Sequence, residues 1–326
     1  MLAPDPRSFD VQAAQTSSFS PRFSEASGLA YHEYGDPSSD QVVVFHHGWP
    51  SAGSQGALFD KPARERGVRI LSPNRPGIGG SRMEEGRGFT HWPSRLNLFL
   101  EDLGVEERIL VMGISGGGPY TLAACAAMPE RVERGGVICG AGMVNGSMSD
   151  MVWLYRLMAR LDRHAPWSLG MVLRVFRILM RLPGSGAGPG TRAAGLPRRD
   201  RLALADPELR DFISRGFVES MEGDVNGVLE DGRLYLKSWD FDPATIRTPV
   251  TFWHGREDRN IPPRMPELLA GTIAGSELQW YKEDGHFSLP LLRAEELLLN
   301  LVDGSERSTP LEDSPGNDSG LQESED

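Results

Sequence analysis

Residues 113–117 read Gly-Ile-Ser-Gly-Gly and place one serine between glycines, directly after the apolar run 109–112. A serine hydroxyl is a weak nucleophile at neutral pH, so it needs a base within hydrogen-bonding reach, an acid that orients the base, and donors for the oxyanion. Flanking glycines let a strand turn sharply into a helix, and Pro119 fits the first turn of that helix. The stretch predicts that Ser115 is a nucleophile on a strand-to-helix corner, the alternative being a plain glycine-rich turn.

Candidates for the acid and the base follow two later apolar runs. Glu257 and Asp258 come after residues 250–253, and His286 comes after residues 278–281. The order serine, acid, histidine, with about thirty residues between the last two, is the order expected of a strand-end serine hydrolase site. A small residue before His286 would let its loop bring the imidazole close.

A second oxyanion donor should come from a loop after an early strand. Residues 46–50 read His-His-Gly-Trp-Pro and follow the apolar run 42–45. The backbone N–H of Trp49 is the natural donor there, paired with that of Gly116 at the start of the helix. The two histidines could also form part of a metal site, but no third ligand has a recognisable spacing, so we expect them to orient the loop and expect no metal or organic cofactor.

The elements that must position these residues alternate along the chain. Strand-like runs occur at residues 29–34, 42–45, 68–71, 109–112, 136–139, 250–253 and 278–281. The later runs are continuously apolar, as in strands covered on both faces, and helical segments lie between them. This alternation predicts an α/β fold with a mostly parallel, doubly wound sheet.

The alternation stops between residues 141 and 236, where only helix-like segments occur, at 150–163, 167–181 and 207–222. We interpret this region as a helical cap inserted between two strands, roofing a pocket at the strand ends. The predicted division is an N-terminal extension (1–21), a first core part (22–140), the cap (141–236), a second core part (237–303) and an acidic tail (304–326).

Five motifs together resemble those of the α/β-hydrolase superfamily, in the serine branch with a helical cap. They are HHGWP, NRPGIGGS from Asn74, GISGGGPY from Gly113, HGREDRNIP from His254 and DGHFSL from Asp284. The resemblance spans about residues 22–303 and is weakest through the cap. It implies an eight-stranded sheet and selects Ser115, Asp258 and His286 as the catalytic triad. Haloalkane dehalogenases and epoxide hydrolases carry aspartate at the nucleophile position, so the serine argues against both.

One position departs from that pattern. Asn74 stands where such proteins usually have aspartate, a residue that supports the loop and takes no part in the chemistry. The change puts the electrostatics of the loop in question and leaves the triad intact.

The composition sets the broad class. The chain has 326 residues, 39% of them hydrophobic and 24% charged, and a net charge of −11, which argues against a nucleic-acid partner. Cys125 and Cys139 form no disulfide framework, and the N-terminal residues have no signal-peptide pattern, so we expect a cytoplasmic protein. The tail carries seven acids against Arg307 and few apolar residues, so we expect it to be disordered.

The cap also carries a basic amphipathic pattern. Arginines 156, 160, 163, 174, 177 and 181 stand at helical spacing opposite Trp153, Leu157, Leu161, Val175, Ile178 and Leu179. Such a stretch can lie on an anionic membrane surface, but more often its apolar face covers a pocket, and we prefer that interpretation.

These observations predict a serine hydrolase that cleaves an ester or related acyl bond of a small, fairly apolar substrate through an acyl-enzyme. The same triad can cleave a carbon–carbon bond in a diketone or hydrolyse an enol-lactone, and it can support acyl transfer or perhydrolysis. A slow-turnover ligand receptor on the same fold would have the same sequence features. The sequence does not specify the oligomeric state.

Overall fold

The computed structural model describes residues 20–142, 153–181 and 195–304. The predicted extension at 1–21 and the predicted tail at 304–326 lie almost wholly outside these residues. The glycine-rich stretch at 183–190 lies outside them as well.

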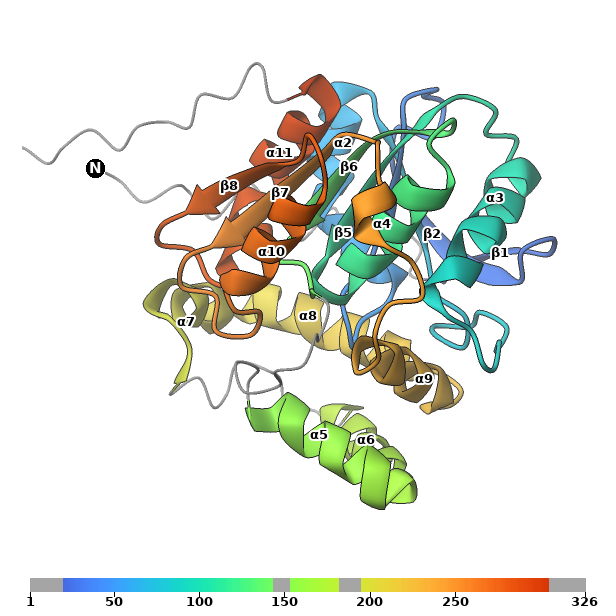
Figure 1. The fold of residues 1–326 in the computed structure, drawn as a ribbon. Helices are drawn as coiled ribbons and strands as arrows, with labels where there is room; N and C mark the ends of the chain where they lie inside the picture. The colour runs from blue at the N-terminus through green and yellow to red at the C-terminus, as the bar shows by residue number, and fades with distance from the viewer. Residues whose placement is uncertain (1–19, 143–152, 182–194, 305–326) are drawn as a thin grey trace, which may run out of the picture.

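The described residues form one eight-stranded sheet (Figure 1). Its strands are β1 (Arg22–Ser24), β2 (Leu29–Gly35), β3 (Val42–His46), β4 (Arg69–Pro73), β5 (Ile109–Ile114), β6 (Val132–Ile138), β7 (Val250–Gly255) and β8 (Glu277–Tyr281). Their order is β1-β2-β4-β3-β5-β6-β7-β8, with β1 and β2 antiparallel to their neighbours and all other pairs parallel. The predicted α/β fold is confirmed, and the strand missing from the sequence prediction is the three-residue β1 at one edge.

Helices cover both faces of the sheet, which explains why its central strands are apolar throughout. The helices of the core are α2 (Asp60–Arg66), α3 (Trp92–Asp102), α4 (Gly118–Ala127), α10 (Arg264–Thr272) and α11 (Ser288–Asp303). Buried side chains of α3, α4 and α10 pack on one face, and those of α2 and α11 pack on the other. Short 3₁₀ turns, η2 (Gly53–Phe59), η3 (Phe89–His91), η4 (Ser115–Gly117) and η7 (Pro243–Thr245), complete the described elements of the core.

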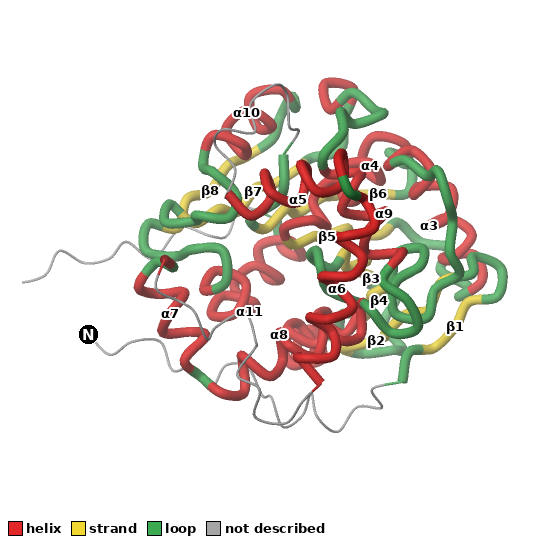
Figure 2. The backbone as a smooth tube through the Cα atoms, turned by 90° about the horizontal axis from the view of Figure 1, so that it is seen from below, coloured by secondary structure: helices red, strands yellow, loops and turns green. Residues whose placement is uncertain are grey.

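Between β6 and β7 the described residues form five α-helices, besides the short turn η7, and no strand. They are α5 (Trp153–His164), α6 (Pro166–Arg181), α7 (Arg198–Ala205), α8 (Pro207–Ser220) and α9 (Asn226–Tyr235). Figure 2 looks at the molecule from the side on which these helices lie, with α5 and α6 in front of the sheet. The sequence pattern predicted α5, α6 and α8 but not α7 and α9.

The apolar residues of α6 point in two directions. Leu169 and Leu173 are buried in a small cluster with α9, whereas Val175 and Ile178 are 51% and 58% exposed. The expected covering of the pocket by Val175 and Ile178 is therefore wrong, because Leu169 and Leu173 form the inward face. No helix in the described ranges has both the length and the apolar character needed to cross a membrane.

Candidate active site

Ser115 lies on the turn that joins β5 to α4. Its φ angle is +51°, in the left-handed region that a side chain rarely adopts. The corner is tight because a Cβ on Gly117 would come within 2.0 Å of the His46 carbonyl oxygen. The flanking glycines thus have the role that the sequence suggested, and the serine is held at the carboxyl end of a central strand.

Asp258 and His286 meet at the ends of β7 and β8. The Asp258 Oδ2 atom lies 2.8 Å from Nδ1 of His286, and both side chains are buried. The other carboxylate oxygen of Asp258 accepts the backbone N–H groups of Asn260 and Ile261, each at 2.8 Å. These bonds fix the carboxylate. Because Asp258 occupies Nδ1 of His286, Nε2 is the imidazole nitrogen that can act on a third group.

The two partners shift each other's ionisation. Burial favours the neutral imidazole, but the Asp258 carboxylate outweighs this and raises the pKa of His286 above its usual 6.5. Burial likewise opposes ionisation of Asp258, but the interaction with His286 lowers the pKa of Asp258. The pair is therefore suited to hold a proton on the imidazole.

Cys139 is the third group at this point. It follows β6 with a φ angle of +47°, and its Sγ lies with the Asp258 and His286 ligand atoms within 4.8 Å of one another. Burial, reinforced by the Asp258 carboxylate, raises the pKa of the Cys139 thiol well above 9. A metal would need the thiolate and would have to break the Asp258–His286 hydrogen bond, so the arrangement fits a proton-transfer site better than a metal site.

Ser115 does not bond to His286 in this structure. Within the described ranges the Ser115 hydroxyl has no hydrogen-bond partner. Catalytic hydrogen bonds are often long without substrate and tighten in the reactive complex, so the observed geometry remains compatible with proton transfer between the two residues.

Trp49 and Gly116, the two expected oxyanion donors, line the same pocket as Ser115. The other lining residues are Ala141, Asp162, Leu169, Leu229, Gly232, Arg233, Tyr235, Leu236 and Ile261. The pocket and its open mouth together enclose about 610 Å³ of empty space, part of which is open to solvent. Its walls are mostly apolar and come from both the core and helices α5, α6 and α9.

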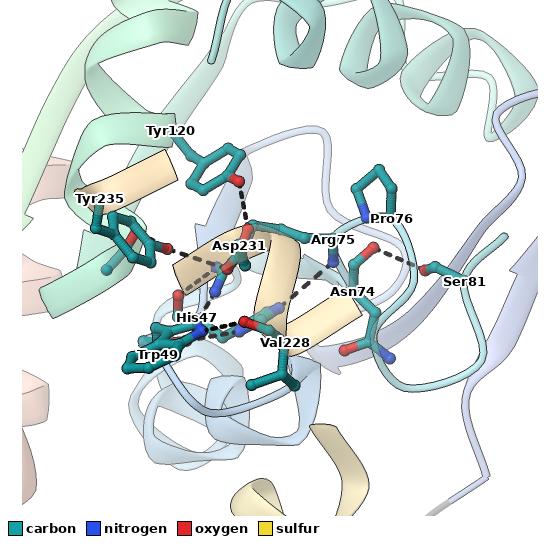
Figure 3. A network of polar contacts seen from close by, with 12 residues as sticks. His47, Trp49, Asn74, Arg75, Pro76, Ser81, Tyr120, Val228, Asp231 and Tyr235 are labelled. Carbon is teal, nitrogen blue, oxygen red and sulfur yellow. Dashed lines mark hydrogen bonds and ion pairs between the residues drawn. The ribbon is translucent and has the colours of Figure 1, made fainter. Parts of the chain in front are cut away.

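A buried group of charges connects α9 to the loops that carry His47 and Arg75 (Figure 3). The Asp231 carboxylate accepts Nε of Arg75 and Nη2 of Arg87, each at 2.8 Å, and it also accepts the hydroxyl of Tyr120. Burial opposes ionisation of Asp231, but Arg75 and Arg87 lower its pKa to about 2. The carboxylate is therefore charged and fully paired in the folded protein.

This group reaches both candidate oxyanion donors. Arg75 donates to the carbonyl oxygens of His47 at 2.5 Å and Gly48 at 2.9 Å, next to Trp49. The Tyr235 hydroxyl donates to the Gly116 carbonyl at 2.8 Å and lies 3.1 Å from Asp231. Each contact holds the peptide segment that carries a predicted donor.

Trp49 is also attached to α9 directly. Its indole Nε1 donates to the Val228 carbonyl at 2.8 Å, and its ring packs edge-on against Tyr235. Sequence reasoning missed Asp231 and Tyr235. The available signal for Asp231 was its spacing, three residues after Val228 and three before Leu234, which places it on the buried face of a helix. A buried acid without a partner is costly, so this position indicates a paired carboxylate.

Asn74 supports its loop through three side-chain contacts, and an aspartate could not make the two that need the amide donor. Its amide nitrogen donates to the Gly79 carbonyl at 2.9 Å and lies 3.3 Å from a carboxylate oxygen of Glu219, while its oxygen accepts the Gly53 N–H at 2.5 Å. An aspartate here would lose the donor and face Glu219 with a like charge. Asparagine at position 74 therefore avoids a like charge beside Glu219, which answers the question that the sequence raised about the electrostatics of this loop.

His46 ends β3 and His47 begins the loop that carries Trp49, and both are buried. The ring nitrogens of His46 lie 2.9 Å from the Thr121 hydroxyl and 3.0 Å from the Trp92 indole nitrogen. Burial, with the nearby Arg75 charge, lowers the pKa of His46 to about 3. Its occupied ring nitrogens agree with a loop-orienting role and leave no position for a metal.

The family model of the alpha/beta hydrolase family matches residues 43–299, so this chain belongs to that family. The match confirms the predicted family, its fold and the predicted class of enzyme, a hydrolase.

A curated relative with high coverage is the 2-hydroxy-6-oxo-2,4-heptadienoate hydrolase of Pseudomonas putida, 25% identical over 272 residues, which are 80% of this chain and 88% of that protein. An esterase from Exiguobacterium antarcticum has a TM-score of 0.62 and 19% identity, covering 84% of this chain and 95% of that one. The enol-lactonase from Burkholderia xenovorans LB400 has a TM-score of 0.63 and 17% identity, covering 86% of this chain and 98% of that one. These two structures share the fold.

Proposed function

We propose that this protein is a serine hydrolase that cleaves an ester or related acyl bond of a small, mostly apolar substrate. The proposal depends most on one observation: Ser115, in a left-handed backbone conformation, opens into an apolar pocket at the same strand ends where Asp258 holds His286. A left-handed serine on such a corner is the arrangement that exposes a nucleophile to a bound acyl group.

In the proposed mechanism the Ser115 oxygen attacks the substrate carbonyl while Nε2 of His286 takes the hydroxyl proton. Asp258 stabilises the resulting imidazolium through Nδ1, and the backbone N–H groups of Trp49 and Gly116 receive the oxyanion. The imidazolium then protonates the leaving alcohol, and an acyl-enzyme remains on Ser115. Water, deprotonated by His286, attacks the acyl group and releases the acid and the free serine.

The pocket favours an uncharged acyl group. Of its described lining residues the cation is Arg233, and its Nε lies 2.8 Å from Asp162. Arg233 also pairs with Glu230, so its charge is already balanced. A carboxylate on the substrate would have to compete with both acids, whereas an alkyl or aryl acyl group would contact Leu169, Leu229 and Leu236.

The first test is labelling of the folded protein with a fluorophosphonate probe, followed by peptide mass spectrometry. We expect the probe on Ser115 and no labelling of Ser115→Ala. Loss of the nucleophile should lower the rate of ester hydrolysis by about three orders of magnitude or more. An active Ser115→Ala variant, or a probe attached elsewhere, would refute the assignment.

The second candidate is carbon–carbon bond hydrolysis in a keto acid or hydrolysis of an enol-lactone by the same residues. The observation that favours it is the similarity to the Pseudomonas putida hydrolase, whose name specifies a 2-hydroxy-6-oxo-dienoate. A panel of neutral esters, enol-lactones and oxo-dienoates separates the two candidates, because the balanced charge of Arg233 predicts higher kcat/KM for the neutral esters. A higher kcat/KM for the oxo-dienoates would favour the second candidate function over the first.

A further inference from the structure

Asp200, on helix α7, is a buried acid whose side chain ends at the histidine loop. Its carboxylate accepts the backbone N–H groups of His286 at 3.1 Å, Phe287 at 3.2 Å and Ser288 at 2.8 Å, and it accepts the Ser288 hydroxyl at 2.6 Å. The side chain is 1% exposed. A carboxylate that accepts from these four donors is held in one place.

These donors lie at the start of α11: Ser288 is its first residue, Phe287 is its N-cap and His286 comes directly before the N-cap. The N-cap residue of this helix, Phe287, provides no side-chain acceptor of its own, so the N–H groups that begin the helix need an acceptor from elsewhere. Asp200 supplies it from another part of the chain, and its negative charge also suits the positive end of the helix dipole. The position of the His286 backbone therefore depends on a residue between β6 and β7.

The approach of Asp200 requires the glycine before the histidine. A Cβ on Gly285 would lie 2.5 Å from a carboxylate oxygen of Asp200, which is too close for any side chain. The Gly285 N–H donates at 2.8 Å to the Ser288 hydroxyl, which itself donates to Asp200. The sequence indicated a small residue here so that the imidazole could come close, and the structure adds that Asp200 occupies the space.

The neighbouring side chains also bind this loop. Arg199, adjacent to Asp200 on α7, pairs with Glu283 at 2.9 Å and with Asp284 at 3.1 Å. Asp284 in turn lies 3.4 Å from Arg293 on α11. The charges of Arg199 and Arg293 are thus paired with Glu283 and Asp284, and within the described residues Asp200 itself has no cationic partner.

Several titratable groups face His286 from the elements around it. Asp258 contacts its Nδ1, Asp200 contacts its backbone, and Cys139 lies beside the imidazole with a neutral thiol. His254 on β7 is 3.6 Å from Asp258 and is kept neutral because burial lowers its pKa. The charges next to the imidazole are thus two carboxylates, which both favour its protonated form.

We propose that Asp200 is a positioning residue for the base: it fixes the His286 backbone so that Nε2 faces Ser115, and its charge stabilises the imidazolium formed when the serine loses its proton. This inference rests on the proposed function, since it assumes that His286 is the base. In this proposal α7 supports the proton transfer through Asp200, although Asp200 touches neither the substrate nor the reacting atoms.

The test compares Asp200→Asn with Asp206→Asn. Asp206 caps the next helix, α8, by accepting the N–H groups of Glu208 and Leu209, so its variant controls for the loss of a capping charge in the same region. The measurement is the rate of fluorophosphonate labelling of Ser115 between about pH 5 and pH 9, which needs no known substrate. The melting temperature of each variant shows whether it is folded.

Two changes are expected in Asp200→Asn. The midpoint of the pH profile should move down by about half a unit or more, because the imidazolium loses a nearby negative charge. The plateau at high pH should fall roughly tenfold, because an amide oxygen holds the loop less firmly than a carboxylate. Asp206→Asn should keep the wild-type midpoint and plateau. A structural role alone would lower the plateau or the melting temperature without moving the midpoint, so an unmoved midpoint overturns the proposal.

Two further measurements keep the result decisive. If Asp200→Asn does not fold, Ser288→Ala removes one of the four donors, and a plateau equal to that of the wild type would then contradict the positioning role. Titration of His286 by NMR with labelled histidine, assigned with His286→Gln, reports the midpoint without any reaction. If the His286 pKa is lower in Asp200→Asn but the probe does not label Ser115 of the wild type, the proposed function is refuted and the effect of Asp200 on His286 is retained. If the probe labels Ser115 but the His286 pKa does not move, the proposed function is retained and the role of Asp200 is refuted.

Discussion

Four of the five α-helices between β6 and β7 fall into two parts that differ in how they meet the core. Helices α7 and α9 are joined to it by buried charges, with Asp200 on the histidine loop and Asp231 on Arg75 and Arg87. The pair α5–α6 contacts α9 through Leu169, Leu173 and the partly exposed pair of Asp162 with Arg233, and it exposes apolar residues such as Trp167. The first part is built into the site, whereas the second lies over it.

This difference teaches that one inserted region can have two tasks. The residues on α7 and α9 hold the backbone segments that carry the proposed base and oxyanion donors, so changing them should affect the chemical step. Residues on α5 and α6 contribute walls of the pocket, so changing them should affect which substrates bind. The following predictions test that division.

The largest effect should come from Asp231→Ala. Removing the carboxylate leaves Arg75 and Arg87 buried without their partner, which should lower the free energy of unfolding by about 3–5 kcal/mol. Urea denaturation measures it, and Asp162→Ala is the matched control on α5, where the pair is partly exposed and should contribute less than about 1 kcal/mol. Equal losses in the two variants would remove the distinction between the two parts.

Tyr235→Phe should act on the chemical step. The variant loses the hydrogen bond to the Gly116 carbonyl and keeps the ring, so kcat for a neutral ester should fall by about tenfold with little change in KM. Steady-state kinetics on a 4-nitrophenyl ester would show it. A rise in KM with an unchanged kcat would place Tyr235 among the substrate contacts instead.

Leu169→Ala should act on binding instead of chemistry. This residue of α6 is buried and lines the pocket, so its truncation should raise KM for long acyl chains by about tenfold and leave acetate esters nearly unchanged. An ester series of increasing chain length measures the effect. A loss of kcat that is equal for all chain lengths would show that α6 also supports the chemistry.

The pH profile of the wild-type enzyme should reflect the two carboxylates near the imidazole. The base must be neutral to accept the serine proton, and the folded pKa of His286 is raised, so kcat/KM should be lost as the pH falls through a midpoint above 6.5. Asp162→Asn, on α5, should leave this midpoint in place. A midpoint below 6.5 would mean that burial outweighs the carboxylates.

The smallest effect should come from Ile178→Ser on the exposed face of α6. Its free energy of unfolding should stay within about 0.5 kcal/mol of the wild type, as should that of Leu202→Ser on α7, which is exposed to a similar extent. A larger loss for Ile178→Ser alone would show that this face is covered in solution. Co-sedimentation with anionic vesicles at low salt tests lipid as the cover, and absence of binding would exclude that role.

Local sequence signals were enough to predict the strand ends and the residues that follow them. Ser115, Asp258 and His286 each follow a strand-like run that is mostly apolar, and glycines mark the corner before α4 and the loop before α11. The assignment of catalytic roles to these residues stays a prediction, although the structure brings Asp258 and His286 together.

Long-range pairing was not predictable in the same way. Asp200 lies 88 positions from Ser288 and Asp231 lies 156 positions from Arg75, and no local pattern states which distant group an acid will meet. Helix α7 was missed because its first turn is charged, and β1 because three residues show no alternation. The prediction of which residues of α6 face inward was wrong because apolar residues occupy more than one face of this helix.

Gly285 and Asp200 have a consequence for the history of this sequence. A side chain at position 285 is excluded by the Asp200 carboxylate, so the glycine is required only as long as the acid is present. The two positions should therefore be inherited together, and in relatives that have lost the acid the residue before the histidine should vary freely. Substitution at 285 would be harmful in one genetic background and neutral in the other, which is the behaviour of an epistatic pair.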